Sequence, residues 1–152
     1  MMKFTAQART RARRYGMQAL YQWDLSGLDL TEIQRQFFEA EDFTNTDGGY
    51  FIELLNGVNT HLENIDAHIS ETIDRPIGQV DPVERAILRL AGYELLFRHD
   101  IPYRVSINEA VLLAKKFGAE QGHAYVNGVL DRMARKTRPA ESPGIDKQVT
   151  GR

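Results

Sequence analysis

The sequence has 152 residues, of which 42% are hydrophobic and 26% are charged, and it contains no cysteine. A chain of this length is expected to form one domain with a sizeable core, and the missing cysteine excludes disulfides, thiolate metal sites and a cysteine nucleophile. The richest apolar stretch, residues 86–97, is interrupted by Arg89 and Glu94, so we expect a soluble, cytoplasmic protein without a membrane span.

The formal net charge of −2 conceals an asymmetry along the chain. Residues 1–22 carry five basic residues and no acidic one, whereas residues 23–83 carry thirteen acidic residues against two arginines. Residues 84–152 are again basic, with twelve Lys and Arg against eight acidic residues. The concentrated basic N-terminus makes nucleic-acid binding a fair hypothesis, which the whole-chain charge does not suggest.

Apolar residues recur at helical spacing nearly throughout, which predicts an all-α protein. The first helix is expected over about residues 6–25, and Gly27 ends it. Asp29 and Asp47 are predicted caps of two further helices. Ile65 and Ile69 lie either on a continuation of the third helix or on a separate turn.

The sequence Arg75-Pro76-Ile77-Gly78 breaks the helical pattern near mid-chain. This break predicts one domain over residues 1–139, divided into two subdomains of about three helices each. The first subdomain is expected over residues 6–74 and the second over residues 80–138. Prolines and polar residues indicate a disordered tail over residues 140–152.

Helix starts are more clearly marked in the second half. Asp81-Pro82-Val83-Glu84 places a carboxylate at the N-cap, proline at the first helical position and glutamate at the third. This helix should end near Arg98. Ser106 to Glu109 resembles a capping box, which predicts a helix from there to Gly118, and a last helix follows.

The arginine cluster Arg9, Arg11, Arg13 and Arg14 is the first candidate site. The planar guanidinium group grips phosphate at two points, and four cations near a helix N-terminus are opposed by the helix dipole, so stability alone does not explain them. A solvated helix face and an organellar transit peptide are the alternative interpretations.

The second candidate site is the glycine-rich segment from Gly118 to Gly128. It suits a tight turn between helices, and that is one interpretation. In the other, Gln121, His123 and Tyr125 are exposed at a helix start, where a ring can stack on an unpaired base.

Catalysis has little support in the sequence. Glu120 and His123 form a single Glu-x-x-His pair, whereas carboxylate-bridged metal sites need two such pairs. His61 and His68 have no obvious third partner, and the common nucleophile and nucleotide motifs are absent. We expect no metal, no cofactor and no small-molecule substrate.

Several motifs occur in order over about residues 8–139. They are Ala12-Arg13, Gln18-Ala19-Leu20-Tyr21, Tyr50-Phe51, Leu54-Leu55-Asn56-Gly57-Val58, Glu84-Arg85-Ala86-Ile87-Leu88-Arg89, Tyr93-Glu94-Leu95, Ile101-Pro102-Tyr103, Ile107-Asn108-Glu109-Ala110, Lys115-Lys116-Phe117-Gly118 and Val126-Asn127-Gly128-Val129-Leu130. With these motifs the chain resembles the NusB family of bacterial transcription antitermination factors.

The resemblance implies two three-helix subdomains and no enzymatic activity. It further implies pairing with NusE, a small-subunit ribosomal protein, and binding of the pair to boxA RNA. With RNA polymerase and other Nus factors, such a complex supports transcription through terminators, notably of ribosomal RNA operons. The implied RNA contacts are Arg9, Arg11, Arg13, Gln121 and Tyr125, and Glu84 is the implied partner contact.

Two departures from the family pattern bear on RNA affinity: Thr10 interrupts the arginine run, and Gln121 stands where an acidic residue can occur. Two alternatives remain at this point. One is a helical scaffold that binds protein only. The other is an RNA-binding accessory domain like those of some rRNA methyltransferases, although we expect no catalytic domain in this chain. The sequence leaves the oligomeric state open, because its apolar stripes suit a core or a dimer interface.

Overall fold

The computed structural model describes residues 5–141, and within this range the chain is helical and contains no β-strand. The α-helices are α1 (Ala6–Ser26), α2 (Leu30–Ala40), α3 (Gly48–Thr60), α4 (Leu62–Ser70), α5 (Pro82–Phe97), α6 (Tyr103–Phe117) and α7 (Gly122–Thr137). Two short 3-10 turns, η1 (Ile77–Gln79) and η2 (Pro139–Glu141), follow α4 and α7. The predicted all-α class is confirmed.

Most of the predicted helix boundaries depend on local capping, and the structure contains these caps. The carboxylate of Asp81 accepts hydrogen bonds from the backbone N–H groups of Val83 and Glu84, each at 3.1 Å. Asp47 caps α3 in the same way, and Gly27 ends α1 in the left-handed conformation with φ of 73°. α4 is a separate helix rather than a continuation of α3.

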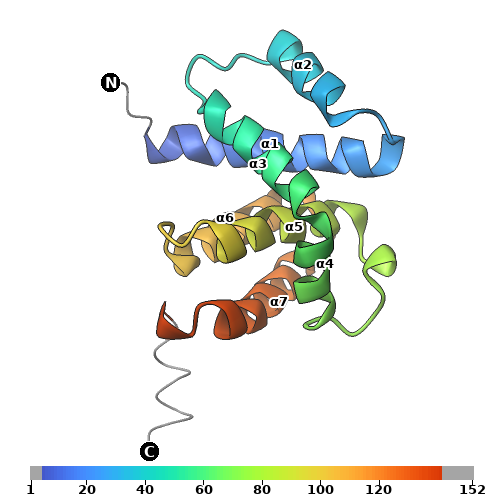
Figure 1. The fold of residues 1–152 in the computed structure, drawn as a ribbon, viewed down its shortest axis with the longest axis vertical. Coiled ribbons are helices and arrows are strands. Elements are labelled where there is room, and N and C mark those ends of the chain that lie inside the picture. The colour runs from blue at the N-terminus through green and yellow to red at the C-terminus, as the bar shows by residue number, and fades with distance from the viewer. Residues whose placement is uncertain (1–4, 142–152) are drawn as a thin grey trace, which may run out of the picture.

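α5 lies at the centre of the fold and packs against α1, α3, α4, α6 and α7. In Figure 1, α1, α2 and α3 occupy the upper part of the view and α7 the lower part, with α5 between them. All but four of the sixteen residues of α5 are buried, including the charged Arg85, Arg89 and Glu94. Arg85 and Arg89 bond carboxylates of α1 and α4, so α5 also joins the helices through charge.

The predicted start of α6 is wrong. The helix begins at Tyr103, directly after Pro102, so Ser106 lies inside it and is buried. The hydroxyl of Ser106 donates to Glu94 at 2.7 Å instead of capping a helix. The first N–H of α6, on Tyr103, is bound by the carboxylate of Glu141 at 3.1 Å, so a distant residue supplies the cap.

Glu141 also corrects the predicted tail. Residues 139–141 form η2, and Glu141 bonds both Tyr103 and Arg138. The rest of the predicted tail, residues 142–152, lies outside the described residues. The division into two subdomains stays a prediction.

Candidate nucleic-acid interface

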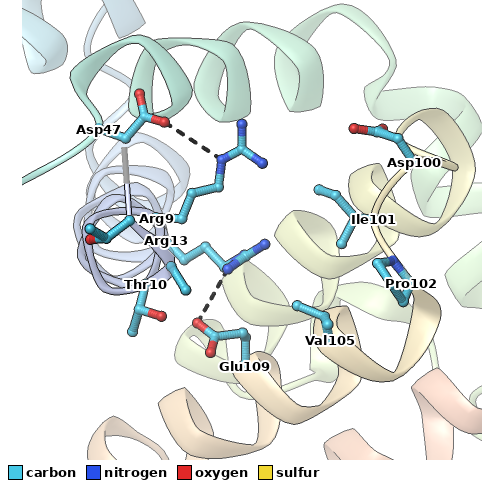
Figure 2. Close-up of a pocket in the computed structure, with 11 residues that line it drawn as sticks. Arg9, Thr10, Arg13, Asp47, Asp100, Ile101, Pro102, Val105 and Glu109 are labelled. Atoms are coloured by element: carbon cyan, nitrogen blue, oxygen red, sulfur yellow. Dashed lines mark hydrogen bonds and ion pairs between the residues drawn. The ribbon is translucent and has the colours of Figure 1, made fainter. Parts of the chain in front are cut away.

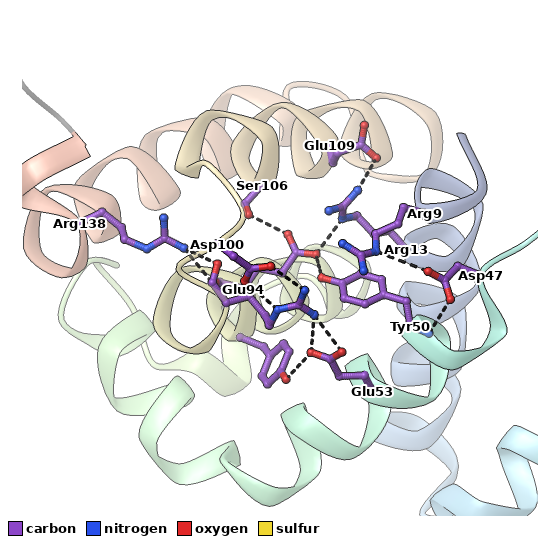
Figure 3. A network of polar contacts seen from close by, with 12 residues as sticks. Arg9, Arg13, Asp47, Tyr50, Glu53, Glu94, Asp100, Ser106, Glu109 and Arg138 are labelled. Atoms are coloured by element: carbon purple, nitrogen blue, oxygen red, sulfur yellow. Dashed lines mark hydrogen bonds and ion pairs between the residues drawn. The ribbon is translucent and has the colours of Figure 1, made fainter. Parts of the chain in front are cut away.

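Arg13 is buried inside the helix bundle. The residue is 4% exposed, and its Nε donates to Oε2 of Glu94 at 2.8 Å while a terminal nitrogen lies 3.3 Å from Oε1 of Glu109 (Figure 3). Burial alone would lower the pKa of Arg13, but the charge of Glu94 and the hydrogen bond to it raise that pKa above its ordinary value. The resemblance implies an RNA contact at Arg13, but two carboxylates of its own chain hold the guanidinium group inside the bundle.

Arg9 faces a hollow of about 600 Å³ between α1, the start of α3 and the α5–α6 connection (Figure 2). Its guanidinium carbon lies 4.1 Å from the centre of the Tyr50 ring, and its Nε lies 3.6 Å from Asp47. The charged lining comprises two guanidinium groups and three carboxylates: Arg9, Arg13, Asp47, Asp100 and Glu109. A polyanion in this hollow would meet more negative than positive charge.

A second, smaller hollow of about 120 Å³ lies between α1 and α6 and is predominantly basic. Arg11, Arg14 and Lys116 line it together with one carboxylate, that of Glu109. Leu112, which is 57% exposed, lies on the same lining and adds an apolar surface. We call this surface, defined by Arg11, Arg14, Leu112 and Lys116, the basic α1–α6 surface.

Sequence reasoning placed Arg11 and Arg14 in the arginine cluster but missed Leu112 and Lys116. Helical periodicity could have divided the arginine cluster into two groups, because residues three or four apart share a face of a helix. Arg9 and Arg13 are four apart and turn toward the carboxylates, whereas Arg11 and Arg14 are three apart and line the basic surface. Lys116 is distant in sequence, and only the packing of α6 beside α1 brings it there.

Tyr125 lies in a third hollow of about 560 Å³ between the end of α4 and α7. The guanidinium carbon of Arg75 lies 4.8 Å from the centre of its ring, so one face of the ring is already covered by a cation. The Tyr125 hydroxyl is buried and has no hydrogen-bond partner among residues 5–141, and burial raises its pKa. The other charged lining residues are Glu71, Asp74, Arg132, Arg135 and Lys136.

Gln121 is exposed at the turn before α7, as predicted. Its φ of 69° makes it the one non-glycine residue with positive φ in the described range. This left-handed conformation strains a residue with a side chain, and Gln121 forms no side-chain cap for α7. The turn presents the amide group to solvent at a conformational cost.

Glu84 lies beneath this turn and is 7% exposed. A Cβ atom added to Gly122 would lie 2.1 Å from Oε2 of Glu84, so the carboxylate packs directly against the turn backbone. Burial and the nearby carboxylate of Asp81 raise the pKa of Glu84, and a hydrogen bond with the backbone of Ala119 opposes them. Glu84 thus supports the turn from inside, whereas the sequence interpretation placed it toward a partner.

The structure therefore separates the candidate residues. Arg11 lies on the basic α1–α6 surface and Tyr125 in the α4–α7 hollow, and the two linings share no residue.

Within residues 5–141 no group of three His, Asp or Glu side chains could hold a metal ion, and no helix is long and apolar enough to span a membrane.

The NusB family model matches residues 10–135. This chain belongs to the NusB family. Among similar proteins, the transcription antitermination protein NusB of Shewanella halifaxensis is 48% identical over 130 residues, which cover 86% of this chain and 96% of the relative. That of Pseudomonas savastanoi pv. phaseolicola is 51% identical over 133 residues, covering 88% and 81%.

Solved NusB structures share the fold. T. maritima NusB superposes with a TM-score of 0.79 at 35% identity, and the match covers 92% of this chain and 97% of the T. maritima chain. A crystal structure of NusB and NusE in complex with dsRNA superposes with a TM-score of 0.81 at 30% identity, covering 87% and 99%. NusB family members are transcription antitermination factors and not enzymes.

Proposed function

We propose that this NusB family member binds boxA RNA together with NusE and, with RNA polymerase and other Nus factors, supports processive transcription, notably of ribosomal RNA operons. This role places it in the cytoplasm. The observation that carries the proposal is the basic α1–α6 surface, where three cations meet one carboxylate. The similar NusB–NusE structure that contains RNA supports the same function.

On this surface, Arg11, Arg14 and Lys116 contact phosphate groups and supply affinity that depends on salt. The exposed Leu112 offers an apolar contact to a base or sugar. Gln121 and Tyr125 extend the RNA path at the start of α7, where an aromatic ring or the Arg75 guanidinium on it can stack on an unpaired base. Arg9 lies outside this surface, half-buried beside Asp47, so its contribution to RNA binding is at most peripheral.

A partner is needed because so few phosphate contacts give modest affinity on their own. Tying a second RNA-binding protein to the first raises the effective concentration of each on the RNA. The acidic segment over residues 23–83 suits a basic partner, since complementary charge speeds encounter. We therefore expect boxA binding to be markedly tighter with NusE present.

The proposal predicts how RNA binding responds to salt. Arg14→Gln and Lys116→Gln should each weaken boxA binding and reduce the magnitude of the log–log salt slope by about 0.7, the counterion release of one phosphate contact on single-stranded RNA. Fluorescence anisotropy over a salt series measures both quantities. Arg35→Gln is the matched control, because Arg35 is exposed on α2 and already pairs with Glu32 and Glu39.

Binding of scrambled RNA tests the sequence preference in the same assay. If the chain with NusE binds boxA and scrambled RNA equally, the proposed function is wrong and the protein-only scaffold is favoured. If both substitutions leave the salt slope at the value of Arg35→Gln, RNA does not use the basic α1–α6 surface.

A further inference from the structure

The Glu94 carboxylate is a junction of four helices. It lies on α5, is fully buried, and accepts hydrogen bonds from Arg13 of α1, Tyr50 of α3 and Ser106 of α6 (Figure 3). Each partner comes from a different helix, so the orientation of Arg13 is linked to the packing of all four. Burial strengthens these contacts, because little water competes for the charges.

Arg13 also fixes the rotation of α1 about its own axis. Successive residues of a helix are about 100° apart, so a guanidinium group held inward at Arg13 sets the directions of Arg11 and Arg14 on the same turn. Those two residues are the α1 contribution to the basic α1–α6 surface. A small rotation of α1 would move both guanidinium groups relative to Lys116 on α6.

An RNA phosphate has no access to Arg13 while this arrangement persists. Its Nε bonds Glu94 at 2.8 Å and a terminal nitrogen pairs with Glu109 at 3.3 Å, and the residue is 4% exposed. Releasing the group to an RNA would leave the Glu94 carboxylate buried without its cation, which is costly.

We propose that Arg13 is a positioning residue for RNA binding: through its bond to Glu94 it orients the exposed cations of α1, and it does not itself contact phosphate. This inference rests on the proposed function. Arg13 thus acts from within the bundle, although the sequence pattern groups it with the phosphate contacts.

The test compares Arg13→Gln, the double variant Arg13→Gln/Glu94→Gln and Arg14→Gln. A glutamine at position 13 places an amide N–H where the arginine Nε lies. A glutamine at position 94 can accept from it and from Tyr50 while donating to Ser106, so the double variant keeps the hydrogen-bond pattern without charge. Arg14→Gln removes a guanidinium group from the basic surface on the same turn and is the matched control.

RNA affinity and salt slope are measured well below the melting temperature of each variant, with folding checked by circular dichroism. We expect Arg13→Gln to weaken binding about tenfold, a coupling typical of contacting residues, because α1 must be reoriented on binding. The wild-type salt slope should be retained, because the bound complex still forms the phosphate contacts of Arg11 and Arg14. The double variant should return to within about twofold of wild type with the same slope. Arg14→Gln should lower the slope by about 0.7.

Three results would overturn the inference. A double variant that folds, binds weakly and has the reduced slope of Arg14→Gln would make Arg13 a phosphate contact. A folded Arg13→Gln variant that binds like wild type would leave Arg13 with a purely structural role. Absence of boxA binding by the wild type with NusE would instead remove the proposed function itself, and the inference with it. Should Arg13→Gln fail to fold, the double variant decides the matter.

Discussion

Glu84 is a carboxylate at a helix start whose main contacts are internal. The raised pKa means that the folded state holds the Glu84 proton more tightly than the unfolded chain, whose ordinary value is 4.5. Its contribution to stability is therefore fully present below about pH 4.5 and is lost as pH rises through the folded pKa. Glutamine at this position has no such proton and keeps an oxygen that can accept a hydrogen bond.

We expect the free energy of unfolding of wild type, minus that of Glu84→Gln, to decrease as pH rises from about 4 to 7. Urea denaturation of both proteins at several pH values measures this difference, in which the other carboxylates cancel. Glu120→Gln, at an exposed carboxylate on the adjacent turn, controls for the loss of one charge. A difference that is constant or increases with pH would contradict the internal role of Glu84.

The site was only partly predictable at the level of single residues. The exposure of Gln121 followed from the turn-forming glycines around it. The burial of Arg13 could not be predicted, because a helical pattern shows which residues share a face but not which residue contacts that face in the interior. Glu94 lies 81 positions away along the chain, and no local signal links the two.

Gly57 allows α3 and α5 to pack closely together. A Cβ atom added there would lie 2.2 Å from the ring of Tyr93, so the aromatic ring of α5 packs directly against the glycine of α3. The Tyr93 hydroxyl then donates to Glu53 at 2.8 Å, one turn earlier on α3. Glycine inside a helix costs about 1 kcal/mol relative to alanine, and close packing offsets this cost.

Gly57→Ala should destabilise the protein by about 2 kcal/mol, because the rigid ring must move and overpacking outweighs the gain in helix propensity. Gly49→Ala is the matched control on the same helix: its added Cβ would meet nothing closer than Asp47 at 3.7 Å, and we expect it to be neutral or stabilising by up to about 1 kcal/mol. Thermal or urea unfolding measures both. Equal effects of the two substitutions would contradict the close crossing.

Helix boundaries were predictable wherever the cap is local. Asp29, Asp47 and Asp81 cap their own helices, and their side chains appear in the sequence next to the groups they bind. The start of α6 was not predictable, because its first N–H is bound by Glu141, 38 residues later. A capping-box pattern at Ser106 was misleading, since tertiary contacts gave that hydroxyl another partner.

Arg138, directly after α7, connects the end of that helix to the end of α5. It is 3% exposed, and its guanidinium group donates to four backbone carbonyls at and beyond the end of α5, those of Glu94, Leu95, Arg98 and Ile101. It also bonds Glu141, which in turn binds the start of α6. One side chain after α7 thus binds the carbonyls of Leu95 and Ile101 and adds a second donor to those of Glu94 and Arg98, which already accept backbone N–H groups.

Arg138→Met should therefore cost about 3 kcal/mol or more, because hydrogen bonds to a charged donor are lost and buried carbonyls remain unpaired. Arg135→Met should cost less than about 1 kcal/mol, because it removes an exposed arginine whose one ion-pair partner among residues 5–141 is Asp131, at 3.0 Å. Urea denaturation measures the two values. A small effect at Arg138 would show that water replaces its bonds.

The central place of α5 has a consequence for synthesis on the ribosome. Since α1, α3 and α4 all pack against α5, a nascent chain that ends before residue 82 has made those helices without the surface that covers them. Their apolar faces stay open to solvent or to chaperones until α5 has emerged. The order of the helices along the chain thus delays closure of the core until α5 has been synthesised.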